Sequence, residues 1–343
     1  MRVGIIGAGG IGHMHARAVA ASDTATLAGV FDLDPARAQS LAQASATVAF
    51  PSPRDLFGAV DGVVIASPNR THADYAHEAI GSGLSVLCEK PMAVSLAQAT
   101  GMRTLAADAP GICAMGFNYR YLHVIREARR LLDEGTLGHV LHVDVAFKRA
   151  SALTRKHFTW RDSAEERLTS GALGDLGVHL IDLLHFLFHR PVDLAACQVA
   201  LRTKVARKGS RAVEVDDHTF VSGRLRTGPS FTLTASKASQ PHETGLTLAL
   251  TGTRGDLTHD SKDGPVLQLR TGVDWEQIKL LGTGRLEDPP GEVTGWADSF
   301  LDQLHDWTRA VAAAPGPRTL ADFEDGHQAQ QVLQDLLRIG EDG

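Results

Sequence analysis

The stretch Val3-Gly-Ile-Ile-Gly7-Ala-Gly9-Gly10-Ile11-Gly12 decides the fold of this chain. A short apolar run leads into closely spaced glycines, and helix-prone residues continue through Ala21. In such a unit the first glycine permits the turn, the second lets a pyrophosphate approach the backbone, and the third lets helix pack on strand. The phosphates then face the positive end of the helix. The stretch therefore predicts the first strand and helix of a dinucleotide-binding sheet.

An acidic residue stands where such a sheet needs one. Residues 27–31 read as a second strand, and Asp32 follows it at the spacing from Gly12 that is typical of dinucleotide sites. Its carboxylate can accept hydrogen bonds from the adenosine ribose hydroxyls, and it repels a ribose phosphate. We therefore expect NAD, while the nearby Arg37 leaves NADP possible. A doubly wound sheet that binds no nucleotide is the alternative.

The alternation of strands and helices continues along the first part of the chain. The sequence predicts a helix over 36–44, a strand over 62–66, a helix over 71–83, a strand over 85–88, a helix over 95–108 and a strand over 112–115. This pattern is typical of a Rossmann doubly wound parallel sheet. Ligands bind at the carboxyl ends of such strands. The candidate cofactor-binding residues are Gly7, Gly9, Gly10, Ile11, Gly12, Asp32, Arg37, Ser67, Pro68, Asn69, His72, Glu89 and Lys90.

A second domain of α+β type is expected after the first, with residues 1–117 in the nucleotide domain and 118–343 in the substrate domain. A helix over 122–134 precedes a strand over 138–147. Further strands are predicted over 194–203, 218–226, 230–238, 246–252, 255–259 and 266–271. They predict a large, mostly antiparallel open sheet. Two terminal helices follow, the second starting near Leu320, and they can pack back on the first domain.

Two proton-handling side chains lie four residues apart in a segment with leucines at helical spacing. On a helix, Asp175 and His179 share one face. A carboxylate beside an imidazole can hold its tautomer and raise its basicity, which makes an acid/base near neutral pH. A capped helix with an ordinary interior histidine is the alternative. One turn further on, Asp182 is either a ligand for a substrate hydroxyl or a surface carboxylate.

Several motifs together carry a family resemblance. They are Gly7-x-Gly9-x-x-Gly12, Ser67-Pro-Asn-Arg-Thr-His72, Glu89-Lys-Pro91, Gly116-Phe-Asn-Tyr-Arg120 and Gly171-Ala-Leu-Gly-Asp-Leu-Gly-Val-His179-Leu-Ile-Asp182. In this order they resemble the Gfo/Idh/MocA family, named for glucose-fructose oxidoreductase and inositol dehydrogenase. The resemblance spans nearly the whole chain. One departure is Ser170, which stands where a glycine is commoner.

The resemblance implies an NAD(P)-dependent oxidoreductase that moves a hydride between the nicotinamide and a secondary hydroxyl or keto group of a sugar, cyclitol or related molecule. It implies that Lys90, Asp175 and His179 form the catalytic group. It also implies a homodimer or homotetramer built through the second domain's sheet. The alternatives are an NADPH-dependent reductase of a ketosugar or dihydrodiol-like substrate, and a sensor of a sugar or dinucleotide without catalysis.

The residues expected around the substrate come from several segments. They are Lys90, Asn118, Arg120, His157, Trp160, Arg161, His179 and Asp182. For Arg120 an interdomain ion pair is the alternative. The basic residues 148–167 form a loop that either covers the substrate or is merely solvated. Within it Arg155, Lys156 and Arg161 could pair with a substrate carboxylate or phosphate. The basic residues 204–211 read as a solvated hairpin.

A metal site is not expected. Spacings of three and four between His179, Asp182, His185 and His189 could place ligands on overlapping helix faces. However, Lys90 would repel a dication, and the family that the chain resembles needs none.

Composition describes an ordinary acidic protein. The 343 residues predict about two domains. With 22% charged residues and a net charge of −6, the chain has no global attraction to nucleic acid or to an anionic membrane. Three cysteines outside any Cys-x-x-Cys pattern indicate neither a disulfide framework nor a thiolate zinc site. We therefore expect a cytoplasmic protein with a small-molecule substrate.

Overall fold

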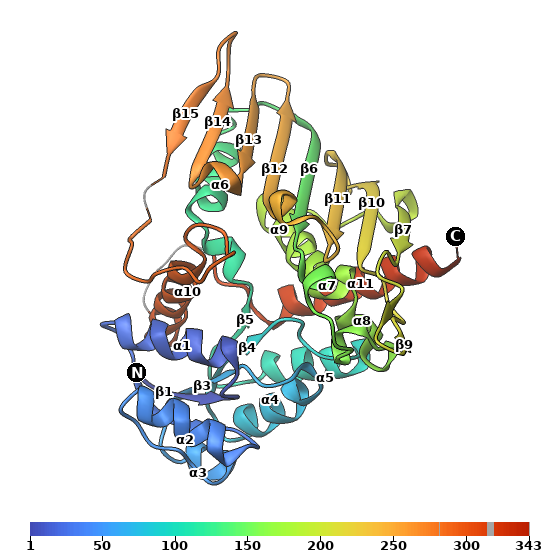
Figure 1. Ribbon diagram of the computed structural model, residues 1–343. Coiled ribbons are helices and arrows are strands. Elements are labelled where there is room, and N and C mark those ends of the chain that lie inside the picture. The colour runs from blue at the N-terminus through green and yellow to red at the C-terminus, as the bar shows by residue number, and fades with distance from the viewer. Residues whose placement is uncertain (281, 314–318, 343) are drawn as a thin grey trace. The chain divides into compact units, whose positions relative to one another are not determined.

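The computed structural model describes residues 1–280, 282–313 and 319–342 (Figure 1). The chain folds into two compact units. The first consists of Met1–Tyr121, Thr283–Pro289 and Trp296–Gln328, and the second of Leu122–Gly282, Pro290–Gly295 and Ala329–Gly343. Each unit therefore combines a long continuous segment with short segments from the C-terminal part of the chain.

The first unit contains a parallel sheet of five strands in the order β2-β1-β3-β4-β5. The strands are β1 Arg2–Ile6, β2 Thr26–Phe31, β3 Gly62–Ile65, β4 Ser85–Glu89 and β5 Cys113–Gly116. The chain leaves β1 toward β2 and then returns to β3 on the other side of β1. Ligands of doubly wound sheets bind at such a switch point, beyond the carboxyl ends of the strands. This arrangement confirms the predicted doubly wound sheet.

Helices cover this sheet, and two of them begin at residues whose side chains cap the amino end of the helix. Asp34 caps α2 and accepts a hydrogen bond from the backbone N–H of Ala36, while Ser95 caps α5 in the same way through Gln98. The helices of this unit are α1 Gly10–Ala21, α2 Pro35–Ala44, α3 Pro53–Phe57, α4 His72–Gly81, α5 Leu96–Ala107 and α10 Trp296–Val311, with short 3₁₀ turns η1 Asn69–Thr71 and η2 Asn118–Tyr121. Helix α10 packs against α1 and η2.

The second unit contains a sheet of eight strands in the order β15-β14-β13-β12-β6-β11-β10-β7. Only β6 and β11 pair in parallel within it, so the prediction of a mostly antiparallel sheet is confirmed. The strands are β6 Val140–Lys148, β7 Gln198–Arg202, β10 His218–Arg224, β11 Ser230–Ser236, β12 Gly245–Gly252, β13 Asp256–Asp260, β14 Val266–Arg270 and β15 Glu276–Lys279. A separate hairpin pairs β8 Arg207–Lys208 with β9 Arg211–Ala212.

The helices of the second unit lie mainly against one face of this sheet. Both α6 and α9 contact its strands and each other. The helical elements are α6 His123–Asp133, α7 Ser151–Thr154, α8 Arg167–Ser170, the π turn η5 Leu173–Gly177 and α9 Val178–Phe188, with short 3₁₀ turns between them. The last helix, α11 Phe323–Asp342, begins in the first unit and ends in the second.

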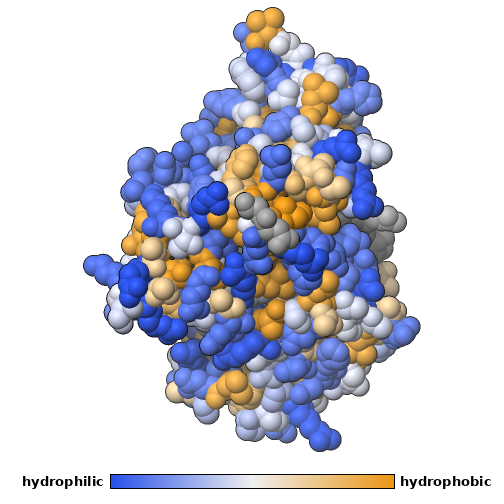
Figure 2. Space-filling view, turned by 90° about the vertical axis from the view of Figure 1, so that its right-hand side faces the viewer, coloured by the Kyte–Doolittle hydropathy of each residue, from blue (hydrophilic) through white to orange (hydrophobic). Residues whose placement is uncertain are grey.

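One helical stretch, Ala164–Phe188, is long and apolar enough to cross a membrane by length and composition. However, 83% of its apolar window is buried inside the structure, which is the pattern of a core helix. The face seen in Figure 2 carries mostly hydrophilic side chains, with hydrophobic ones interspersed among them. Scattered exposed apolar side chains of this kind are normal.

Candidate functional site

The glycine turn between β1 and α1 leaves room for a ligand. Gly7 has a φ of 101°, and a Cβ there would lie 2.6 Å from the backbone of Ala66. A Cβ at Gly12 would lie 1.9 Å from the carbonyl oxygen of Gly7, so α1 packs this closely only with glycine. By contrast, a Cβ at Gly9 or Gly10 would meet nothing within 4 Å. The turn therefore exposes backbone at the place where a pyrophosphate would bind.

The carboxylate of Asp32 is held beside this turn. One oxygen accepts from the backbone N–H of Ala8 at 2.7 Å and the other from that of Asp34 at 2.8 Å. A carboxylate has further lone pairs, so ribose hydroxyls can still donate to it. Arg37 is 67% exposed and pairs with Asp34 at 3.3 Å. The residues present therefore fit an NAD molecule.

A buried histidine ties the end of β3 to the segment after β4. The two ring nitrogens of His72 lie 2.9 Å from the carbonyl oxygen of Pro91 and 3.0 Å from that of Ser67. Burial lowers the pKa of this imidazole, although both carbonyls raise it. The hydroxyls of Ser67 and Thr71 share a hydrogen bond of 2.7 Å around η1, which contains Asn69 and follows Pro68.

A second buried histidine supports the segment that contains Lys90. His15 on α1 lies 2.8 Å from the carboxylate of Glu89, which also accepts from the backbone N–H of Lys90 at 3.2 Å. A Cβ on Gly116 would lie 2.8 Å from this carboxyl group, so glycine at the end of β5 leaves it space. The peptide bond between Lys90 and Pro91 is cis. The sequence prediction did not include His15. The available signal was its position, three residues after Gly12 on a helix face that turns inward.

Asn118 and Arg120 are both buried in the first unit. The side-chain amide of Asn118 donates to the hydroxyl of Ser299 at 2.9 Å. The guanidinium of Arg120 pairs with Asp325 at 3.2 Å and lies 5.9 Å from the ring centre of Phe117. The ion pair of Arg120 therefore forms inside the first unit.

In the second unit, Asp216 holds the start of the helix with the predicted acid/base residues. Its carboxylate accepts from the backbone N–H of Leu173 at 2.9 Å. A Cβ on Gly171 would lie 1.9 Å from this carboxylate, so any side chain there would displace it. Ser170 stands where a glycine is commoner. Its hydroxyl donates to the carbonyl of Ser163 at 2.9 Å, so the serine has a structural role here.

The predicted helix is not a uniform α-helix, because Asp175 lies in the π turn η5 that leads directly into α9. Such turns are rare and are frequent at functional sites. His179 is 5% exposed, and its ring meets that of Phe147 edge-on, with the centres 6.1 Å apart. Asp182 is only 2% exposed, so the alternative that it is a surface carboxylate is wrong. Sequence periodicity cannot show a single π turn.

Two cations flank Asp175. The Nζ of Lys237 and the Nε of Arg161 lie 3.8 Å and 3.9 Å from the same carboxylate oxygen. Arg161 is 44% exposed and its guanidinium lies 4.3 Å from the ring centre of Trp160. Lys237 is buried and was missed by sequence analysis. The available signal was the alternation of β11, which would turn this lysine inward with Leu233 and Ala235.

The basic loop and the basic hairpin are joined through a buried acid. Arg155 donates to Asp162 at 2.7 Å, and Lys208 lies 3.0 Å from the same oxygen. Burial raises the pKa of Asp162, but these cations outweigh burial and hold the pKa at about 2. Lys208 is 5% exposed, and Arg211 stacks 3.5 Å from the ring centre of Phe158. Most of residues 204–211 are exposed, as expected for a solvated hairpin, and Lys208 is the exception because it turns inward to Asp162.

The remaining predicted residues of this unit are two in the basic loop and two near the end of α9. Lys156 and His157 are exposed. His185 is in the last turn of α9, and His189 ends that helix with a φ of 49°. Within residues 1–280, 282–313 and 319–342, no three His, Cys, Asp or Glu side chains gather as a metal site.

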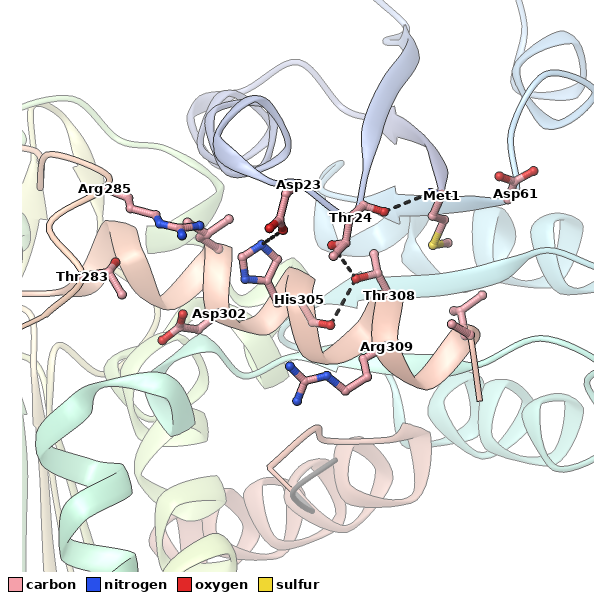
Figure 3. Close-up of a pocket in the computed structure, with 13 residues that line it drawn as sticks. Met1, Asp23, Thr24, Asp61, Thr283, Arg285, Asp302, His305, Thr308 and Arg309 are labelled. Carbon is pink, nitrogen blue, oxygen red and sulfur yellow. Dashed lines mark hydrogen bonds and ion pairs between the residues drawn. The ribbon is translucent and has the colours of Figure 1, made fainter. Parts of the chain in front are cut away.

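A cavity of about 840 Å³ in the first unit is not the nucleotide site (Figure 3). It is lined by residues that precede strands, namely Met1, Thr24 and Asp61, and by His305 and Thr308 of α10. Because the strands are parallel, these amino ends lie at the sheet edge opposite the glycine turn. The cavity is therefore remote from the edge that carries the predicted cofactor residues.

We predict that Asp32→Asn weakens the preference for NADH over NADPH by roughly tenfold, because the neutral amide no longer repels a ribose phosphate. The amide oxygen preserves an acceptor for the loop. Titration of each reduced cofactor, followed by nicotinamide fluorescence, measures the ratio. Arg37→Ala is the control and should leave NADH binding unchanged. Tighter binding of NADPH than NADH by the unaltered protein would contradict this interpretation of Asp32.

Comparison with known proteins matches both parts of the chain to one family. The family model described as "Oxidoreductase family, NAD-binding Rossmann fold" matches residues 1–117, and that of the "GFO/IDH/MocA C-terminal domain" matches residues 125–258. Glucose-6-phosphate 3-dehydrogenase of Bacillus subtilis (strain 168) is 36% identical, over 97% of this chain and 94% of that protein. Inositol 2-dehydrogenase 2 of Paenarthrobacter aurescens (strain TC1) is 28% identical, over 98% of this chain and 95% of that protein.

A solved structure also shares the fold. Levoglucosan dehydrogenase in complex with NADH and levoglucosan superimposes with a TM-score of 0.87 at 23% identity, over 100% of this chain and 97% of that chain. The predicted fold, cofactor and oxidoreductase class are confirmed. The chain belongs to the Gfo/Idh/MocA family of NAD-binding oxidoreductases.

Proposed function

We propose that the protein is an NAD-dependent dehydrogenase that oxidises a secondary hydroxyl group of a phosphorylated sugar such as glucose 6-phosphate. The observation that carries this proposal is the 36% identity to glucose-6-phosphate 3-dehydrogenase over 97% of the chain. The inositol and levoglucosan dehydrogenases among the relatives support the same class of polyhydroxylated substrate.

We assign two side chains, those of His179 and Lys90, to the carbinol group that is oxidised. NAD, when bound, supplies the hydride acceptor at the nicotinamide. The imidazole of His179 removes the hydroxyl proton as the C–H hydride leaves, so that the carbinol becomes a ketone. The ammonium of Lys90 donates a hydrogen bond to the same oxygen and stabilises its developing negative charge. Asp175 orients the imidazole, and Asp182 binds a neighbouring hydroxyl.

The phosphate of the substrate is assigned to Arg161. Of the cations in its loop, Arg155 is already paired with the buried Asp162 at 2.7 Å. Arg161 keeps a longer contact of 3.9 Å to Asp175, beyond hydrogen-bond distance, and is 44% exposed. Stacking on Trp160 fixes the plane of its guanidinium. A planar guanidinium so placed suits bidentate binding of a phosphate group.

Lys90→Met and His179→Gln should each lower kcat for glucose 6-phosphate by on the order of 10²–10⁴-fold. Both variants should still bind NADH, because the glycine turn is intact. The measurements are NADH formation by absorbance and NADH binding by fluorescence. Lys156→Met, which removes an exposed lysine, is the control and should keep full activity. Near-normal turnover by either variant would refute the catalytic assignment, and a wild-type protein that binds NADH without oxidising any sugar would indicate a sensor.

Arg161→Leu should raise KM for glucose 6-phosphate roughly 10- to 100-fold, since charged hydrogen bonds contribute about 1.5–3 kcal/mol. KM for glucose, which lacks the phosphate, should change little. Arg167→Leu is a matched control, because Arg167 is also 44% exposed and pairs with Glu341 instead. Equal changes for both sugars in Arg161→Leu would remove the phosphate assignment and leave an uncharged sugar or cyclitol as the substrate.

We also propose that the open face of the eight-stranded sheet joins copies of this chain. Helices α6 and α9 contact strands of this sheet. The sheet also has a hollow of about 510 Å³, which is lined by small and polar residues such as Ala249, Thr234 and Thr247. Sedimentation of the protein should show a dimer or tetramer. Ala249→Arg places a charge in the hollow and should shift the distribution toward the monomer. A monomer alone at micromolar concentration would overturn this proposal.

A further inference from the structure

Lys237 is a buried cation that the proposed reaction does not use. It follows β11 and extends the inward-facing series Phe231, Leu233 and Ala235, and only 2% of it is exposed. Burial of an ammonium group is strongly unfavourable unless hydrogen bonds and an opposite charge compensate it. The surroundings of Lys237 therefore indicate what its charge does.

The backbone and the side chain of Lys237 are both fixed. Its N–H donates to the carbonyl of Asp217 at 2.8 Å, and its carbonyl accepts from the N–H of Ala152 at 2.7 Å. The ammonium donates a short hydrogen bond to the carbonyl of Ser170, at the end of α8, and lies 3.8 Å from the carboxylate of Asp175. The charge is thus held between a helix end and the π turn.

Four charged groups act on this ammonium. Burial lowers the pKa of Lys237, while the carboxylates of Asp175 and Asp216 raise it and the guanidinium groups of Arg155 and Arg161 lower it. Asp216 already accepts hydrogen bonds from the N–H of Leu173 and from a threonine hydroxyl. Of the two carboxylates, Asp175 is therefore the one through which the ammonium acts on the proposed catalytic group. If Arg161 turns to a substrate phosphate, Lys237 is the buried cation that stays beside Asp175.

We propose that Lys237 is a positioning residue that keeps Asp175 ionised and aligned during turnover. This inference rests on the proposed function, in which Asp175 orients His179. A positive charge beside a carboxylate favours its ionised form and disfavours protonation of a nearby imidazole. Without the ammonium, the pair of Asp175 and His179 would hold a proton more tightly. A purely structural role, as a cap for the carbonyl of Ser170, would affect stability alone.

Lys237→Met removes the ammonium group and keeps an unbranched side chain up to the ε position. The acid limb of the kcat/KM profile against pH should move upward by about 0.5 to 1 pH unit, so that kcat/KM at a fixed pH on that limb should fall roughly three- to tenfold. Lys208→Met is the matched control, because Lys208 is also buried but pairs with Asp162. It should lower the melting temperature without moving the profile. In an Asp175→Asn background, Lys237→Met should produce no further shift.

A second measurement separates this inference from the proposed function. NMR titration of protein labelled at the histidine rings follows His179 without any substrate, and Lys237→Met should move its titration midpoint upward. Lys237→Gln can still donate to the carbonyl of Ser170 but carries no charge, so it should give the same upward shift as Lys237→Met. This variant replaces Lys237→Met in the titration if the methionine variant does not fold. A change in melting temperature with unchanged pH profile and unchanged His179 titration would overturn the inference. Failure to oxidise any sugar would instead overturn the proposed function, while the NMR result would stand.

Discussion

The second unit depends on the pair Asp216 and Asp217, which anchors two separate segments at one place. Asp216 caps the helix that begins after Gly171, and this cap leaves no space for a side chain at that glycine. The next carbonyl, that of Asp217, accepts from the N–H of Lys237. The helix with Asp175 and the strand end with Lys237 are therefore held by neighbouring residues. Their charges meet because the backbone around them is fixed.

The first unit uses buried imidazoles for a similar purpose. His15 reaches Glu89 from α1, and His72 reaches the carbonyl of Pro91 from α4. The two contacts lie on either side of Lys90 in the sequence. The helix that follows the glycine turn is thereby connected to the segment with the proposed catalytic lysine. Polar groups buried in this way are satisfied by each other, which favours a single arrangement of the backbone.

Sequence patterns predicted the parallel sheet, the glycine turn and the mostly antiparallel second sheet, because each depends on local periodicity or on glycine at a crowded contact. They did not predict that Lys208 and Lys237 are buried, since a lysine goes inward only when a distant carboxylate meets it. The π turn around Asp175 also escaped, because the leucine spacing fits an α-helix equally well. Apart from that turn, the features that the sequence did not predict are pairings between segments far apart in the chain.

The most direct test of the account is the fate of the carbinol hydrogen. The protein is incubated with NAD and glucose 6-phosphate that carries deuterium on every carbon, and the NADH is examined by mass spectrometry and NMR. The account predicts one deuterium at the nicotinamide C4 for each ketone formed, because the hydride passes directly from the sugar. NADH without deuterium, or a sugar consumed with no NADH, would contradict it.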